Sequence, residues 1–357
     1  MSIKDRNIVW ITLDSVRADH TSVHGYGRNT TPQLDQIAKS DNGEKFDNAI
    51  AHSTRTPVSV PSMLTGLYPF QHGMVGTRSG DMIPDSLDTA PELLAEEGYH
   101  TIGVSENGYA GAAKGIDTQF EEFVRPVKLK DAYKPEIGLT LLKYLFSIRE
   151  HGPGISLDKS SHRENRSFFT TEIAKQKIRQ AQNKPFFCYI HYNDPHHPYI
   201  PPVNYRSEFV DQIESTSTEA LNYVKRMHEE LYEWMASGLS MTNEEWNMIY
   251  AMYDAVIKYT DACIGELFRF LQNQFDDMIV VITSDHGELF GEKGLLGHHM
   301  ILDDAVTHVP LVTHGLDNIA NHTDMPTQHI DIMQTILASV GADASQFQGY
   351  DIRNESR

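Results

Sequence analysis

Cysteine and positive charge are both scarce in this sequence of 357 residues. Its two cysteines, Cys188 and Cys263, lie in apolar runs, so we expect buried thiols rather than a disulfide. Lysine and arginine number 30 against 49 aspartates and glutamates, which gives a formal net charge of -19. A nucleic-acid partner requires a basic surface that neutralises phosphates, and this composition therefore argues against one.

Long apolar runs are missing as well. No stretch approaches the roughly 18 uninterrupted apolar residues of a membrane helix, so no membrane span is expected. Residues 1–6 lead directly into the first apolar block without the hydrophobic region of a signal peptide. We therefore predict a cytoplasmic protein, while the sequence gives no indication of its oligomeric state.

Apolar blocks rich in β-branched residues alternate with helical patterns along the chain. Blocks without period-2 alternation are typical of strands buried on both faces of a parallel sheet. We predict an α/β fold with a doubly wound, mostly parallel sheet and helices on both faces. The expected strands are 7–13, 46–51, 101–104, 185–191, 278–283 and 310–313, and the main expected helices are 32–39, one beginning at Met63, 88–97, 168–182, 244–271 and 330–340.

A single domain is predicted over residues 1–345, because motifs near both ends of the chain point to one site. Residues 346–357 are expected to form a tail. Residues 125–165 are mixed in character, with a hydrophobic patch at 139–148 between charged stretches. This segment indicates an insertion that covers the site or contacts a partner.

Acidic residues directly follow two of the predicted strands. Asp14 ends the strand 7–13, and Asp285 with His286 ends the strand 278–283. In open α/β sheets ligands bind at the carboxyl ends of strands, where an aspartate and a histidine offer oxygen and nitrogen to a divalent metal. The other interpretation is that Asp285 caps a turn and His286 is an ordinary polar loop residue.

Five short motifs, in order, are NIVWITLDSVRADH (7–20), YGRNTTPQLD (26–35), LTGLYP (64–69), DPHHPY (194–199) and SDHGE (284–288). Together they resemble the sulfatase-like family of the alkaline phosphatase superfamily, over roughly residues 5 to 342. The resemblance implies that Asp14, Asp285 and His286 are metal ligands. Manganese, zinc and magnesium fit such a site. Calcium fits it less well, because Ser15 stands where many sulfatases have a second acidic ligand.

The nucleophile depends on the register of the family motif. Sulfatases place a Cys or Ser, oxidised to formylglycine, at a fixed distance before Thr-Gly. Counting back from Thr65 and Gly66 gives Thr56, which cannot become formylglycine. We prefer Thr56 as a metal-bound hydroxyl nucleophile, as in phosphatase and phosphodiesterase relatives. The alternatives are Ser59 in another register, or a structural role for Thr56 as a helix cap.

Histidines occupy the remaining family positions. The resemblance implies that His196 contacts the transferring group and that His298 stands where sulfatases usually have a lysine. An alternative is a second metal held by Asp194, by His197 or His196, and by His298. Arg17, Asp19 and His20 are expected to shape a loop, and His72 is expected to be structural. Asn107 stands where many sulfatases have another lysine.

These observations predict a metal-dependent hydrolase or transferase of phosphoric or sulfuric esters, with phosphoesters favoured. One divalent cation is expected, and the expected substrate is a small molecule, a glycan or a lipid-headgroup ester. The alternatives are a sulfatase that acts without formylglycine or through Ser59, and an inactive binding protein with the same fold.

Overall fold

The computed structural model describes residues 6–76, 81–126, 138, 140, 142–144, 146, 166–181, 184–298, 301–319 and 323–354. Most of the predicted insertion 125–165, including much of its patch at 139–148, lies outside these residues. No helix among the described residues has the length and apolar character needed to cross a lipid bilayer.

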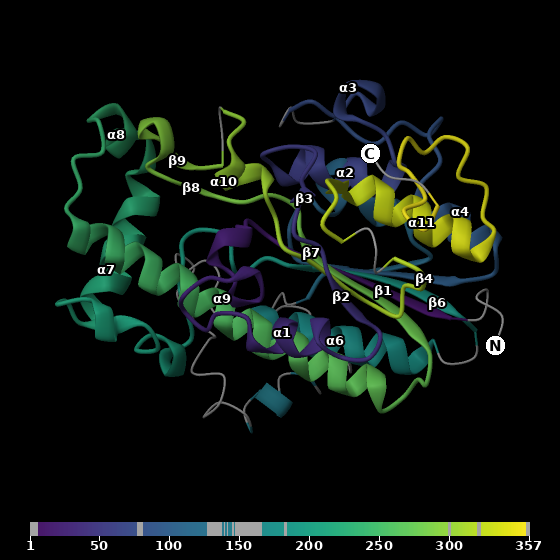
Figure 1. The fold of residues 1–357 in the computed structure, drawn as a ribbon, viewed down its shortest axis with the longest axis horizontal. Coiled ribbons are helices and arrows are strands. Elements are labelled where there is room, and N and C mark those ends of the chain that lie inside the picture. Colours follow the sequence, from purple (N-terminus) through teal and green to yellow (C-terminus); the bar gives the residue numbers. More distant parts are fainter. Residues whose placement is uncertain are drawn as a thin grey trace.

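A seven-stranded sheet runs through the centre of the molecule (Figure 1). The order is β2-β10-β7-β1-β6-β4-β5, and the five strands from β7 to β5 are parallel. Strand β10 is antiparallel to β7, and β2 is antiparallel to β10. The strands are β1 (Asn7–Leu13), β2 (Gly43–Lys45), β4 (His100–Ser105), β5 (Glu122–Val124), β6 (Phe186–Tyr192), β7 (Met278–Ser284) and β10 (Leu311–His314).

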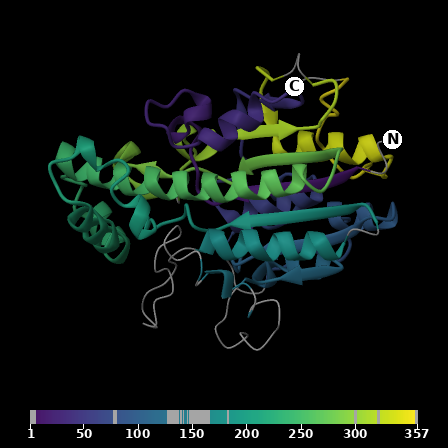
Figure 2. The same cartoon turned by 90° about the horizontal axis from the view of Figure 1, so that it is seen from below.

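Helices cover both faces of this sheet, which confirms the predicted doubly wound α/β fold (Figures 1 and 2). One face is covered by α1 (Pro32–Ala38), α6 (Arg166–Gln180) and α9 (Asn243–Gln272). The other is covered by α2 (Thr56–Thr65), α4 (Ala90–Glu96) and α11 (His329–Val340). Successive side chains of β1 point to opposite faces of the sheet. Val9 packs into the hydrophobic cluster under α1, α6 and α9, and Trp10 into the cluster under α2, α4 and α11.

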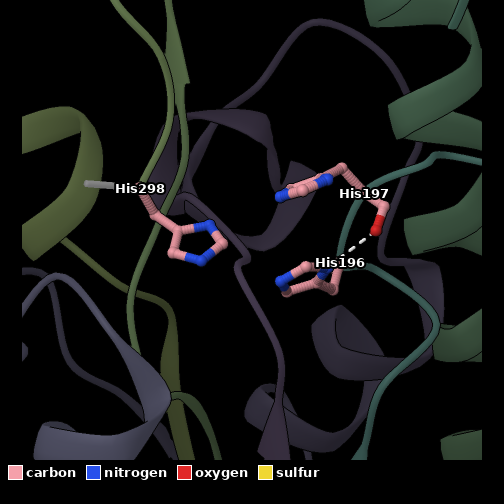
Figure 3. A group of neighbouring side chains, drawn as sticks. All are labelled: His196, His197 and His298. Carbon is pink, nitrogen blue, oxygen red and sulfur yellow. Dashed lines mark hydrogen bonds between the residues drawn. The ribbon is translucent and has the colours of Figure 1, made fainter. Parts of the chain in front are cut away.

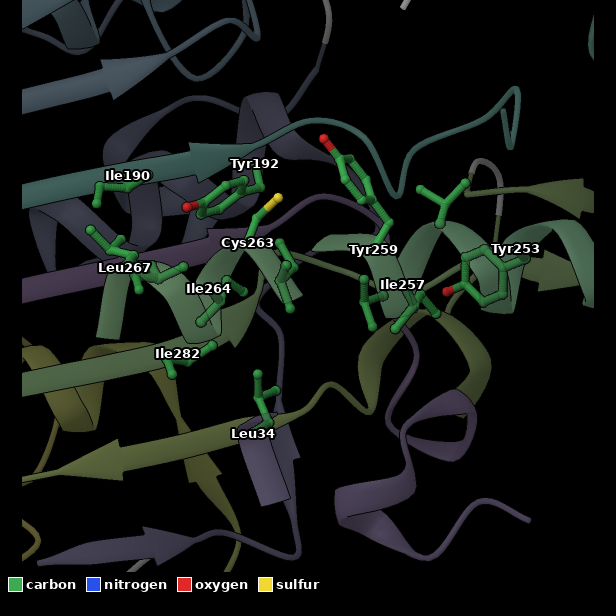
Figure 4. Packing of buried hydrophobic residues seen from close by; sticks show 14 of the residues in the cluster. Leu34, Ile190, Tyr192, Tyr253, Ile257, Tyr259, Cys263, Ile264, Leu267 and Ile282 are labelled. Atoms are coloured by element: carbon green, nitrogen blue, oxygen red, sulfur yellow. The ribbon is translucent and has the colours of Figure 1, made fainter. Parts of the chain in front are cut away.

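The helix α9 contributes many residues to the hydrophobic cluster on the face that it covers (Figure 4). Its residues Cys263, Ile264 and Leu267 pack against Ile190 of β6 and Ile282 of β7 in one buried cluster. Both cysteines are free and buried, as predicted. Thr242 precedes the helix and forms a reciprocal capping box with Glu245, which fixes where α9 begins.

Two predicted elements are wrong in their extent. The helix expected to begin at Met63 begins seven residues earlier, at Thr56, because Pro57 occupies its first turn, where a proline is tolerated. The strand expected over 46–51 shrinks to β3 (Ala49–Ile50), which pairs with β11 (Thr327–Gln328) outside the main sheet. The residues 346–352, expected as a tail, pack back onto α11: Tyr350 N–H donates to Asp331, and Ile352 is buried.

Smaller elements lie beyond the carboxyl edge of the sheet and around it (Figure 1). Helices α7 (Ser217–Glu229) and α8 (Leu231–Ala236) form a helical extension beside the hairpin of β8 (Leu289–Phe290) and β9 (Leu296–Gly297). Two short α-helices in the described ranges are α3 (Pro69–His72) and α10 (Asp304–Thr307). The 3-10 helices are η2 (Ala18–His20), η3 (Ser22–His24), η4 (Ala112–Lys114), η5 (Ile116–Gln119), η7 (Val203–Tyr205), η8 (Val210–Gln212) and η9 (Glu292–Gly294).

Candidate active site

Polar side chains from four adjacent parallel strands meet at one edge of the sheet. Asp14 follows β1, Asp285 and His286 follow β7, Asn107 lies just after β4, and His191 is the penultimate residue of β6. The backbone locks these ends together, since Asp285 N–H donates to Leu13 O at 3.2 Å. Parallel strands that end together deliver side chains to one point, as the sequence predicts.

The two aspartates differ in how their oxygens are satisfied. Asn107 Nδ2 donates to Asp14 Oδ2 at 2.7 Å, and Ser15 Oγ donates to Asp14 Oδ1 at 3.0 Å. Asp285 Oδ1 accepts the backbone N–H groups of Ser15 and His286. Asp285 Oδ2 is buried and accepts no hydrogen bond from the described residues. An unsatisfied buried carboxylate oxygen is costly unless a cation or proton meets it.

The ring of His286 is fixed in a definite orientation. His286 Nδ1 lies 2.9 Å from Gly287 O, which can only accept, so Nδ1 carries the proton. Its Nε2 lone pair then faces Asp14 Oδ1 at 3.8 Å and Asp285 Oδ2 at 3.6 Å. A neutral imidazole held by a backbone carbonyl in this way is the usual state of a metal-ligating histidine.

Burial and mutual charge shift the pKa values of these groups. For Asp14 burial acts to raise the pKa, but His196, His191 and His286 outweigh it and hold the pKa well below its usual range. Burial and the charge of Asp14 raise the pKa of Asp285 to about 7. Burial and the neighbouring His298 lower the pKa of His286 to about 4. Near neutral pH, Asp285 is therefore poised to exchange its proton for a cation.

The donor set suits a divalent metal. Asp14, His191 and Asp285 each offer one ligand atom within 4.8 Å of the others, and His286 Nε2 lies beside both carboxylates. Carboxylate oxygens with imidazole nitrogens match zinc and manganese in particular. The three predicted ligands, Asp14, Asp285 and His286, thus lie close enough to share one ion.

Helix α2 brings Thr56 to this cluster and turns Ser59 away from it. Thr56 Oγ1 lies 3.3 Å from His286 Nε2, and the hydroxyl is the donor because His286 Nδ1 carries the ring proton. Arg55, not Thr56, is the N-cap of the helix, and no side chain caps it. Ser59 is fully buried and donates to Asp285 O at 2.6 Å. The hydroxyl that faces the cluster is that of Thr56.

Three histidines form a second group next to the first (Figure 3). His196, His197 and His298 each place a ring nitrogen within 4.8 Å of the others. The His298 ring lies 4.4 Å, between centroids, from that of His286, so the two groups are continuous. His298 Nδ1 donates to Glu288 Oε1 at 2.9 Å, and His196 Nδ1 donates to His197 O at 2.7 Å. The rings of His196 and His298 are therefore each held by an oxygen acceptor.

Asp194 does not belong to the histidine group, which corrects its predicted place with His197 and His298. Its two oxygens accept the N–H groups of Arg166 and Ser167, the first residues of α6, at 3.2 and 2.5 Å. The carboxylate therefore satisfies the open amides of a helix N-terminus. In the structure the group consists of His196, His197 and His298.

Sequence reasoning missed His191 as a site residue. It is fully buried, and its Nε2 lies 3.3 Å from Asp14 Oδ2, while its Nδ1 contacts the Tyr189 hydroxyl at 3.2 Å. A histidine within an otherwise apolar and aromatic strand was the available signal, because a buried polar ring needs a polar partner.

The residues expected to be structural do hold the surroundings in shape. Arg17 pairs with Asp19 at 2.7 Å and also donates to Glu288 O. His72 Nε2 contacts Ser62 Oγ at 2.9 Å beneath α2. His20 Nδ1 lies 2.8 Å from the buried Asp254.

Comparison with known proteins finds relatives over nearly the whole chain. The chain is 24% identical over 403 residues to the multifunctional alkaline phosphatase superfamily protein PehA of Trinickia caryophylli, covering 95% of this chain and 74% of that one. Phosphonate monoester hydrolase of Agrobacterium radiobacter has the same fold, with a TM-score of 0.69 at 20% identity, covering 99% of this chain and 78% of that one.

The C-terminal periplasmic domain of EcEptC from Escherichia coli, solved in complex with zinc, also matches with a TM-score of 0.69. Its identity is 14%, and the match covers 99% of this chain and 88% of that one. At these identities the two structures show a shared fold. The profile of the family described as Sulfatase matches residues 6–342, almost the whole chain. The chain therefore belongs to the sulfatase family of the alkaline phosphatase superfamily.

Proposed function

We propose that this protein is a metal-dependent hydrolase or transferase of phosphoric esters, with Thr56 as its nucleophile. Asp14, Asp285, His286 and Thr56 would hold one divalent cation. The observation that carries the proposal is the contact of Thr56 Oγ1 with His286 Nε2 at 3.3 Å, between two carboxylates. When bound, the cation would lower the pKa of the hydroxyl and offset the charge of an anionic ester.

The side chains of the site favour phosphate over sulfate. Positions that carry lysine in many sulfatases are Asn107, which donates to Asp14, and His298, which donates to Glu288. Thr56 cannot be converted to formylglycine, and Ser59 is buried and bonded to Asp285 O. Phosphate esters keep more charge on their oxygens than sulfate esters and depend more on a cation.

The histidine group would supply the hydrogen-bond donors of the site. His196 and His298 lie beside His286, where each ring, once protonated on both nitrogens, can donate to an oxygen of the ester as charge develops on it. Small-molecule, glycan and lipid-headgroup esters all fit this chemistry. The cytoplasmic location remains a prediction from the sequence.

A substrate panel tests the proposal. Purified protein loaded with zinc or manganese is assayed on matched aryl phosphate diesters, phosphate monoesters and sulfates. We expect phosphoesters, diesters first, to be turned over faster than sulfates. Thr56→Ala should lower kcat at least about a thousandfold, as removal of a nucleophile does in other enzymes. Ser59→Ala, the matched hydroxyl deletion one turn along α2, should stay within about tenfold of the unsubstituted protein.

Two outcomes would contradict the proposal. Loss of activity in Ser59→Ala with activity retained in Thr56→Ala would assign the nucleophile to Ser59. Faster turnover of aryl sulfates by metal-loaded protein, with formylglycine detected by mass spectrometry, would restore a sulfatase activity. Protein that binds metal but turns over none of these esters would favour a binding role.

A further inference from the structure

A fourth histidine reaches the histidine group from the helical extension. His228 lies in the last turn of α7, and its Nδ1 is 2.6 Å from Nδ1 of His197. The two ring centroids are 4.8 Å apart. Two imidazole nitrogens at this distance share one proton, so one ring donates and the other accepts.

The surroundings of the two rings indicate which one donates. His228 is partly exposed at the carboxyl end of α7, where the helix dipole favours a protonated ring nitrogen. His197 is buried, with 8% of its surface exposed. If His228 donates, His197 Nδ1 accepts, and the ring proton of a neutral His197 must then sit on Nε2. In Figure 3 the ring nitrogen of His197 that lies away from its backbone, Nε2, points toward His298.

His197 then differs from its neighbours. His196 and His298 give their Nδ1 protons to a backbone carbonyl and to Glu288, so their neutral rings carry lone pairs on Nε2. Of the three rings in the group, His197 is the one whose Nδ1 faces another nitrogen instead of an oxygen acceptor. The three neutral rings therefore differ at Nε2, which is protonated in His197 and unprotonated in His196 and His298.

We propose that His228 is a positioning residue that makes His197 present an N–H donor to an oxygen of the bound ester. This assignment rests on the proposed phosphoester function. It gives His197 a role in holding the anionic group, because an N–H aimed at a developing negative charge stabilises it. It also removes His197 from the ligands of a second metal, since a protonated Nε2 has no lone pair to give.

Ring-nitrogen NMR tests the tautomer without any substrate. Protein labelled with ¹⁵N-histidine is recorded with and without zinc, and His197 is assigned from the signal lost in His197→Gln. We expect Nε2 of His197 to be protonated and Nδ1 to be a lone pair. In His228→Leu this preference should disappear, whereas His228→Asn should keep it, because its amide N–H lies near the place of Nδ1. A proton on Nδ1 of His197 in the unsubstituted protein would overturn the proposal.

Kinetics supply the second test. On an aryl phosphodiester, His228→Leu should lower kcat by about tenfold with little change in KM, and His228→Asn should recover most of it. Glu229→Leu, at the exposed next residue of α7, is the control and should change neither constant. Equal loss in the Leu and Asn variants, or a second equivalent of zinc that disappears in His197→Ala, would contradict the assignment.

These results separate the two proposals. If no phosphoester is turned over, the proposed function fails, but the NMR spectra still report the His197 tautomer. If phosphoesters are turned over and the tautomer is reversed, only the role of His228 fails.

Discussion

The carboxylate group and the histidine group lie side by side and are built in opposite ways. Asp14, Asp285 and His286 are fully buried, and strands of the central sheet hold them. His196, His197 and His298 come from a loop after β6 and from the hairpin region, and the helical extension contacts them. The first group is held by strands of the central sheet, and the second by a loop, the hairpin region and a helix outside the sheet.

Their charges differ in the same way. Asp14 keeps a strongly depressed pKa and Asp285 an elevated one, which describes two acids that compete for one cation. The histidine group presents ring nitrogens to the same space. A cation on one side and neutral or positive donors on the other are the two partners that an anionic ester requires. On the proposed function, the sheet would hold the cation, whereas the loop after β6, the hairpin region and the helical extension would adjust the groups that the ester contacts.

The largest effect should come from Asp285→Asn. Removing this carboxylate takes away the oxygen that accepts no hydrogen bond, so metal content should fall below about 0.1 equivalent and activity by at least roughly a thousandfold. Elemental analysis and the phosphodiester assay measure the two losses. Circular dichroism should show an intact fold. Full activity in this variant would place the metal centre elsewhere.

A smaller loss of activity is expected from a substitution in the histidine group. His298→Gln removes the ring held by Glu288 and should lower kcat about a hundredfold, while about one equivalent of metal remains. Lys293→Ala, an exposed change on the same hairpin, serves as the control. Loss of all metal from His298→Gln would mean that the two groups form a single metal centre, and it would contradict the separate roles that we assign to them.

The same contrast explains what the sequence could predict. Asp14, Asp285 and His286 follow apolar blocks, and a buried parallel strand fixes where its last residue points. Asp194 and His196 lie two residues apart in a loop, where no periodicity determines side-chain direction, so the sequence could not decide which of them lies beside His298. His191 was overlooked because it lies inside a strand. His228 comes from a separate helix, and only tertiary packing brings it to His197.

Asp194 offers a test of that correction. Because it accepts two N–H groups at the start of α6, Asp194→Ala should lower the free energy of unfolding by about 1–2 kcal/mol. Urea denaturation measures this loss. Metal content and kcat/KM should stay within about threefold of the unsubstituted protein. Loss of a metal equivalent at unchanged stability would return Asp194 to the histidine group.

The last effect concerns pH and distinguishes two members of the carboxylate group in metal-free protein. Asp285 has a pKa near 7 in the fold against 3.8 for an ordinary aspartate, so between pH 4 and 7 the folded state binds more protons there than the unfolded state does. Its contribution to stability therefore falls as pH rises. His286 has a pKa near 4 against 6.5, so its contribution falls as pH drops from 6.5 toward 4.

These two dependences oppose each other between pH 4 and 6.5, and Asp285→Asn removes only the first. The variant should therefore gain stability relative to the unsubstituted protein as pH rises from 4 to 7, by up to about 1.4 kcal/mol per pH unit. Thermal unfolding in the presence of a chelator, at half-unit steps of pH, measures the difference. A constant difference across this range would mean that Asp285 is already ionised without metal. Burial and the charge of Asp14 would then raise its pKa much less than we infer.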